Sequence, residues 1–218
     1  MEVDFDSQIP NSEPLNIYKV QSYNASQTKI YTMLDVLNKQ LPMKIKKARE
    51  ILCLDSEDEI ITILRHFDWK HQKMEERWFD DDDDKEYKIG LKLNPKLMNQ
   101  YPEINASLAA NNDNMCAICY VEFEENDPLY SAVSLNCGHQ YCSNCWGYYL
   151  RDKVASNGPQ CVFTTCPQLR CNVVVPHSLF LKYLEDKPFE DGINYREKYN
   201  LWHCKQFTDH NSNIKWCP

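Results

Sequence analysis

The chain has 218 residues, 11 cysteines, and 24 Lys and Arg against 32 Asp and Glu, which gives a net charge of −8. This length suits one ordinary domain or two small domains, and we expect two, because ten cysteines lie from Cys116 onward. The apolar runs are too short to span a bilayer, and the acidic balance disfavours nucleic acid or an anionic membrane as a partner. A protein partner is expected.

Residues 1–27 are polar and contain Pro10 and Pro14, so we interpret them as a mostly disordered tail. Their start has three acidic residues and lacks the basic and apolar regions of a secretory signal. A reducing compartment, and therefore free thiols rather than disulfides, is the expectation. This predicts a cytoplasmic protein, with the nucleus left open as an additional location.

Apolar residues recur at helical spacing through residues 28–79. A first helix is expected from Thr28, with a corner at Pro42 before a second helix that ends near Asp55. Ser56-x-x-Glu59 has the pattern of a capping box, which predicts a third helix over residues 57–67, followed by a short fourth one. The residues expected in the core of this helical domain are Cys53, Leu64, Phe67, Met74, Trp69 and Trp78.

Residues 80–113 begin with the acidic run Asp80–Asp84, continue through two prolines and end rich in asparagine. The run is interpreted as a solvated hinge, and the whole stretch as a linker that is partly ordered by packing.

Beyond the linker the spacing of cysteine and histidine is typical of metal ligands. The candidates are Cys116, Cys119, Cys137, His139, Cys142, Cys145, Cys166 and Cys171. Four ligands saturate a tetrahedral zinc ion, so eight predict two closed, structural zinc sites; an iron–sulfur cluster is a weaker alternative. In a RING the first and third ligand pairs hold one ion and the second and fourth hold the other.

One ambiguity concerns the last pair, because Cys161 and Cys166 have the same spacing as Cys166 and Cys171. We favour Cys166 with Cys171, since Pro167 sets a turn directly after the first of them.

The motifs Cys116-Ala-Ile-Cys119, Cys137-Gly-His-Gln-Tyr-Cys142 and Cys166-Pro-Gln-Leu-Arg-Cys171 resemble the first RING of a RING-between-RING (RBR) ubiquitin ligase. Ile63–Trp69 and Met74–Phe79 are similar to the ubiquitin-associated-like (UBA-like) domain of the ariadne type. The ending Ile214–Pro218 resembles the start of the in-between-RING domain, where Cys217 would be a first zinc ligand.

The resemblance implies an α+β chain of small domains: a UBA-like bundle (28–79), a linker (80–113), a cross-braced two-zinc RING (114–176), a connecting helical segment (177–213) and the start of a truncated in-between-RING domain (214–218). The connecting segment is expected to contain two helices, split near Pro188 and Gly192. They are expected either to touch an activating ubiquitin or to lack their normal packing partner.

In function, the resemblance implies a RING that recruits a ubiquitin-charged conjugating enzyme for transfer to a substrate protein. Ile118, Tyr149 and Pro167 occupy the positions expected to contact that enzyme. Asn172 stands where many directly acting RINGs have an arginine, which agrees with transfer through a cysteine.

The family's catalytic cysteine belongs to a second RING and matches no residue of this chain. Cys53, Cys161 and Cys204 are interpreted as structural thiols. Whether the chain is part of an enzyme is therefore open, and the alternative is a zinc-binding adaptor for conjugating enzymes or ubiquitin-like modifiers.

Overall fold

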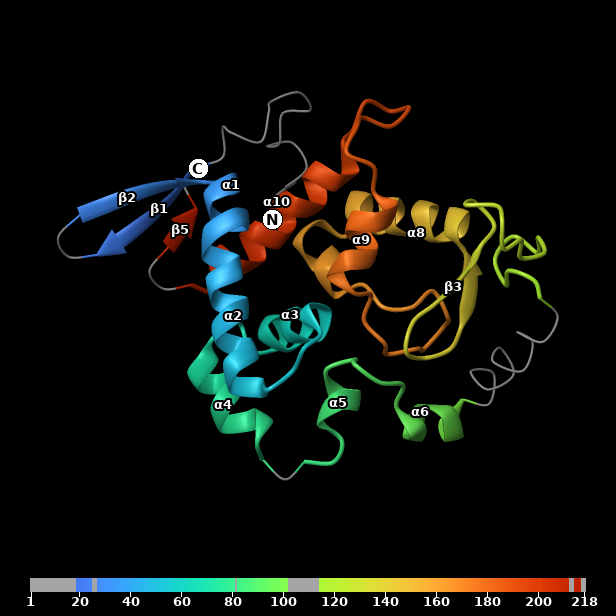
Figure 1. Ribbon diagram of the computed structural model, residues 1–218, viewed down its shortest axis with the longest axis horizontal. Coiled ribbons are helices and arrows are strands. Elements are labelled where there is room, and N and C mark those ends of the chain that lie inside the picture. The colour runs from blue at the N-terminus through green and yellow to red at the C-terminus, as the bar shows by residue number, and fades with distance from the viewer. Residues whose placement is uncertain (1–18, 25–26, 81, 102–113, 212–213, 217–218) are drawn as a thin grey trace, which may run out of the picture.

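The computed structural model describes residues 19–24, 27–80, 82–101, 114–211 and 214–216. It is rich in helices, with two small antiparallel sheets and a cysteine-rich region that carries one of them (Figure 1). Among these residues, no helix is both long and apolar enough to cross a membrane.

The first sheet joins the two ends of the described chain. Strands β1 (Lys19–Asn24), β2 (Gln27–Thr32) and β5 (Ile214–Trp216) lie in the order β2-β1-β5, all antiparallel. The helix expected from Thr28 is therefore wrong in its first turn. Thr28, Ile30 and Thr32 alternate as β-branched residues, which favours a strand there. Of the expected tail, residues 19–24 form β1 and Gln27 opens β2 instead of being disordered, and residues 1–18 and 25–26 lie outside the described residues.

One continuous helical path follows the sheet. It comprises α1 (Met33–Asp35), the π-helical turn η3 (Val36–Gln40) and α2 (Leu41–Leu52). A capping box between Thr32 and Asp35 opens it. The corner expected at Pro42 is wrong, because this proline lies in the first turn of α2. The wide π turn just before Pro42 relieves the crowding that a proline ring causes within a helix.

Two shorter helices complete this part, α3 (Glu57–His66) and α4 (His71–Trp78). Ser56 caps α3 by accepting a hydrogen bond from the amide of Glu59. Cys53 is exposed rather than buried, because it ends α2 in the left-handed conformation (φ 53°) while Leu52 takes the core position. We call α1 to α4 with η3 the helical unit. Its buried side chains include Leu64, Phe67, Met74, Trp69 and Trp78, as expected.

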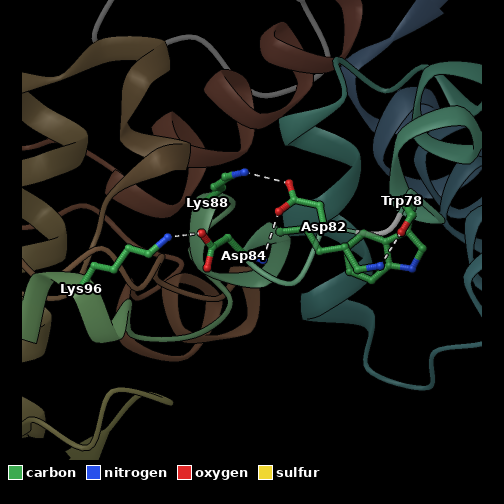
Figure 2. A network of polar contacts seen from close by, with 6 residues as sticks. Trp78, Asp82, Asp84, Lys88 and Lys96 are labelled. Atoms are coloured by element: carbon green, nitrogen blue, oxygen red, sulfur yellow. Dashed lines mark hydrogen bonds and ion pairs between the residues drawn. The ribbon is translucent and has the colours of Figure 1, made fainter.

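The stretch after the acidic run packs against the cysteine-rich region. It contains α5 (Lys85–Lys88) and α6 (Pro95–Gln100). Asp82 pairs with Lys88 (2.8 Å) and Asp84 pairs with Lys96 (Figure 2). The Lys85 ammonium donates to the Trp78 carbonyl (2.7 Å). The described part of the acidic run is therefore not a free hinge, because two of its carboxylates pair with lysines that follow it in the sequence. Such exposed pairs orient this stretch more than they stabilise it.

The cysteine-rich region contains the hairpin of β3 (Ala132–Ser134) and β4 (Gln140–Cys142), helix α8 (Ser143–Ser156) and the 3-10 helix η5 (Gly158–Phe163). Two helices then lead back toward the first sheet, α9 (His177–Tyr183) and α10 (Tyr195–Asp209).

Helix α10 runs between the helical unit and the cysteine-rich region (Figure 1). Tyr199 and Trp202 belong to the core of the cysteine-rich region, whereas Cys204 and Phe207 belong to that of the helical unit. Helix α10 therefore has its packing partners within this chain, and the expectation that it lacks them is wrong.

Candidate metal centre

The β3–β4 hairpin explains how the chain crosses between two ligand sets. Cys137 and His139 lie in the connection between its strands, where Gly138 adopts φ +80°. Cys142 ends β4 and serves as N-cap of α8, and Cys145 lies in the first turn of that helix. One short hairpin therefore presents its turn to one cluster and the end of its second strand to the other.

Isolated β-bridges close the remaining two ligand loops. Met115 pairs with Glu122 around the loop of Cys116 and Cys119. Thr165 pairs with Val174 around the loop of Cys166 and Cys171. Both loops include a residue other than glycine in the left-handed conformation, Tyr120 (φ 59°) and Arg170 (φ 63°). Such tight loops bring thiols that are close in sequence to one point in space.

The eight candidate ligands form two clusters, and the ligand atoms of each lie within 4.8 Å of one another. The first cluster is Cys116, Cys119, Cys142 and Cys145, and the second is Cys137, His139, Cys166 and Cys171. This is the alternating partition expected of a RING. Cys161 belongs to neither cluster; it is buried in η5.

The donor sets fit zinc. Sulfur atoms bound to one tetrahedral zinc ion lie about 3.8 Å apart, and the Sγ atoms of Cys119 and Cys142 are 3.7 Å apart. In the second cluster Nδ1 of His139 lies 3.7 Å from Sγ of Cys166. Four soft or borderline donors leave no open position for water, so each zinc ion would act as a structural cross-link. The two clusters fit two such ions.

Crowding of the ligands also sets their protonation. In the second cluster, hydrogen bonds with Cys166 and Cys171 lower the pKa of the Cys137 thiol, whereas hydrogen bonding to Cys137 raises that of Cys166. In the first cluster burial disfavours the Cys116 thiolate, but hydrogen bonds from the backbone N–H groups of Cys119, Cys142 and Ile118 and from the Cys119 thiol together lower its pKa to about 7. Without a cation, neighbouring thiols resist joint ionisation, so a divalent ion would be needed to hold them all as thiolates.

The three residues expected to contact a conjugating enzyme differ in exposure. Ile118, between two ligands of the first cluster, is 46 % exposed, and Pro167 is half-buried. Tyr149 is half-buried too, and its hydroxyl donates to the Thr165 carbonyl (2.8 Å), so it braces the last ligand loop. Sequence reasoning missed Leu169, which is 67 % exposed in that loop. An apolar residue between two closely spaced ligands was the available signal.

Asn172 has a definite role within the chain. Its Oδ1 accepts from the amide of Asn94 (3.0 Å), and its Nδ2 donates to the carbonyls of Tyr87 (2.7 Å) and Lys92 (2.9 Å). The Gly90 carbonyl also accepts from the amide of Val174 (2.9 Å). The stretch 85–101 is therefore fastened to the end of the last ligand loop. We call it the strap.

Three further thiols lie outside the clusters among the described residues. Burial raises the pKa of Cys161 to about 12, and burial likewise raises that of Cys204. Cys53 is exposed on the helical unit. The first two are held protonated, which is the opposite of an activated nucleophile. Cys217 lies outside the described residues.

These features define a cross-braced, two-zinc module. Comparison with known families agrees, since the family "Zinc finger, C3HC4 type (RING finger)" matches residues 116–167. The C3HC4 order is that of the eight clustered ligands.

Relatives extend the similarity beyond the RING. The chain is 28 % identical over all 218 residues to the probable E3 ubiquitin-protein ligase rbrA of Dictyostelium discoideum, covering 37 % of that protein. It is 29 % identical over 174 residues to the probable E3 ubiquitin-protein ligase ARI9 of Arabidopsis thaliana, which is 80 % of this chain and 30 % of ARI9. It is also 29 % identical over 156 residues to the E3 ubiquitin-protein ligase arih1 of Xenopus laevis, which is 72 % of this chain and 27 % of arih1.

These matches agree with the resemblance of the motifs to ariadne-type RING-between-RING ubiquitin ligases. The chain spans about a third of the length of these curated relatives.

Proposed function

We propose that this chain is part of an RBR E3 ubiquitin-protein ligase, in which its RING recruits a ubiquitin-charged conjugating enzyme. The observation that carries the proposal is the pair of exposed apolar side chains on the ligand loops, Ile118 between Cys116 and Cys119, and Leu169 between Cys166 and Cys171. The similar proteins are named E3 ubiquitin-protein ligases or probable ones, which supports the proposal.

Ile118 and Leu169 would bind a partner well because the loops that carry them are rigid. Each loop would be fixed at both ends by a zinc ion and closed by a β-bridge, so its backbone loses little freedom on binding. A few desolvated apolar anchors commonly dominate the affinity of a protein interface. Pro167 adds a stiff residue to the loop of Leu169, and Tyr149 holds that loop through the Thr165 carbonyl.

The proposal assigns no thiol chemistry to the ligand cysteines, Cys161 or Cys204. Cys161 and Cys204 are buried with raised pKa values, and the ligand thiols are committed to the clusters. Ubiquitin transfer to a substrate protein would therefore use a cysteine other than these. The same binding surface would serve the adaptor alternative, and only transfer distinguishes the two roles.

A second part of the proposal concerns the helical unit. We propose that α2, α3 and α4 form a UBA-like bundle that binds ubiquitin or a ubiquitin-like modifier. Support comes from three short helices packed around Leu52, Ile60 and Leu64, and from the motif similarity of Ile63–Trp69. Chemical-shift changes confined to the helical unit on addition of ubiquitin or a ubiquitin-like modifier are the expected result; no change with any of them would contradict the assignment. The proposed location is the cytoplasm, with the nucleus left open as an additional location.

Binding of purified ubiquitin-conjugating enzymes to the zinc-loaded chain, measured by calorimetry across a panel, tests the main proposal. We expect Ile118→Ala and Leu169→Ala each to weaken binding by about tenfold, or about 1.4 kcal/mol. Met43→Ala is the matched control, because Met43 is equally apolar and 69 % exposed but lies on α2. Native mass spectrometry verifies that every variant keeps its zinc. Equal affinity of all three variants and the original chain would refute the docking surface.

A further inference from the structure

A buried polar cluster joins the helical unit to both α10 and the cysteine-rich region. Its centre is Arg65 of α3, only 2 % exposed. The guanidinium donates from Nη1 to the Val162 carbonyl in η5 (3.0 Å) and from Nη2 to the Tyr199 hydroxyl (3.0 Å). Nη2 also lies 2.9 Å from Nδ1 of His203. His177 of α9 completes the cluster, with Nδ1 2.7 Å from the Tyr199 hydroxyl. We call these five residues the Arg65 joint.

The hydrogen bonds fix the protonation of both imidazoles. An arginine side chain only donates, so Nδ1 of His203 must accept from Arg65. The Tyr199 hydroxyl accepts from Arg65, and Nδ1 of His177 is the acceptor within reach of its own proton. His203 is therefore neutral, with its hydrogen on Nε2, and a neutral His177 with the same tautomer accepts the Tyr199 proton. A proton added at Nδ1 of His203 would break its hydrogen bond with Arg65, and one added at Nδ1 of His177 would force the Tyr199 hydroxyl to turn its own proton away.

The charges around the joint oppose a second cation. The ring centroids of His177 and His203 are 4.6 Å apart, so a charge on one faces the other as well as the guanidinium. Burial first, and then Arg65, lowers the pKa of His177 to about 4 and that of His203 well below its usual range.

Other charged or titratable groups face the joint from the elements packed around it. Asp58 of α3 favours a charge on His177, whereas Arg196 of α10 opposes it, and Lys198 and the buried thiol of Cys161 lie nearby. Among the described residues, Asp58 is the carboxylate that acts on the joint, and it is engaged by the amide of Ser178 (2.9 Å). Its effect on His177 is smaller than that of Arg65, and burial and Arg65 together keep the pKa of His177 lowered.

We propose that the Arg65 joint is an acid-release switch, which locks the helical unit onto α10 and η5 while His177 and His203 are neutral and opens when they take up protons. The consequence lies at the far end of α10. That helix leads into β5, and β5 pairs with β1. Opening the joint would let α10 change its orientation relative to the helical unit. The path of the chain from α10 to β5 would then no longer be fixed.

The sign and size of the response follow from linkage. The closed joint binds fewer protons than the open one, in which each ring regains a pKa of about 6.5. Closure is therefore favoured fully above that pH and weakens as the pH falls below it. Between pH 7.5 and 5.5 each ring is expected to raise the opening equilibrium about tenfold, and both rings about 100-fold.

Hydrogen exchange of the α10 amides in the whole zinc-loaded chain, corrected for the intrinsic pH dependence of exchange, measures this opening. The double variant His177→Asn, His203→Asn keeps an acceptor near each Nδ1 position and cannot titrate. We expect it to lose the pH response, while His210→Asn, at the end of the same helix but outside the joint, keeps it. Zinc loss at low pH would accelerate exchange in the double variant too, so the difference between the two proteins isolates the joint.

Two results would overturn the proposal: α10 exchange in the original chain that does not respond to pH, or the same response in the double variant. Nitrogen chemical shifts of the imidazoles in the unaltered chain give a test that needs no variant. Both rings are expected to carry their hydrogen on Nε2 and to stay neutral at pH 6. A proton on Nδ1 of either ring at that pH would equally overturn the assignment.

Discussion

Gly90 is the residue at which the strap comes closest to the last ligand loop, and its replacement tests whether the strap is an integral part of the RING. Gly90 has φ +81°, and a Cβ there would lie 2.5 Å from Cγ2 of Val174 and 2.7 Å from the Asn172 carbonyl oxygen. Gly90→Ala therefore incurs two penalties. The left-handed backbone costs about 1–2 kcal/mol in any residue with a Cβ, and overpacking costs about 1–3 kcal/mol more.

Gly192→Ala separates the two penalties. Gly192 has the same φ of +81°, but an added Cβ there would meet no atom within 4 Å among the described residues. It should lose only the backbone part, about 1–2 kcal/mol. The extra loss in Gly90→Ala, about 1–3 kcal/mol, therefore measures the close approach of strap and loop.

Urea unfolding of the two zinc-loaded variants gives this difference, and exchange of the Val174 amide gives a local reading. That amide donates to the Gly90 carbonyl, so a strap that detaches instead of destabilising the whole chain would expose it. Equal stability of the two variants, together with an equally protected Val174 amide, would refute the reasoning.

Two further predictions concern single groups. Cys171→Ser should reduce the bound zinc from two ions to one per chain whereas Cys161→Ser should leave two, measured by native mass spectrometry; the reverse result would move the last ligand to Cys161. A hydrogen bond from Lys39, and then those from Thr32, lower the pKa of Asp35 to about 2. The stability from this carboxylate is thus present above pH 4 and lost toward pH 2, and Asp35→Asn should flatten that part of a pH–stability curve; an unchanged curve would contradict it.

Residues that act through local spacing were predictable from the sequence. The ligand pairs, Ser56 as a cap and the buried aromatic residues of the helical unit each depend on neighbours a few positions away. The alternating partition of the ligands was expected because their order resembles that of a RING. The unexpected exposure of Cys53 depends on one left-handed residue that no pattern marks.

What the sequence did not predict are contacts between segments far apart. Arginine side chains are mostly exposed in proteins, yet Arg65 is buried because Val162, Tyr199 and His203 supply acceptors from distant elements. The pairing of β1 with β5 likewise joins opposite ends of the described chain. Asn172 was interpreted from the sequence only as a position where many directly acting RINGs have an arginine. In the structure its side-chain amide holds the strap by hydrogen bonds. Long-range packing of this kind leaves no periodic signal.

The central claim is that two zinc ions organise the cysteine-rich region into a rigid platform. Native mass spectrometry of the chain, prepared with zinc and a reductant, tests it most directly when it is combined with amide exchange before and after a strong chelator. Two zinc ions per chain, and loss of protection in the β3–β4 hairpin and the start of α8 once they are removed, are the expected results. A chain that binds no zinc yet keeps that region protected would contradict the account.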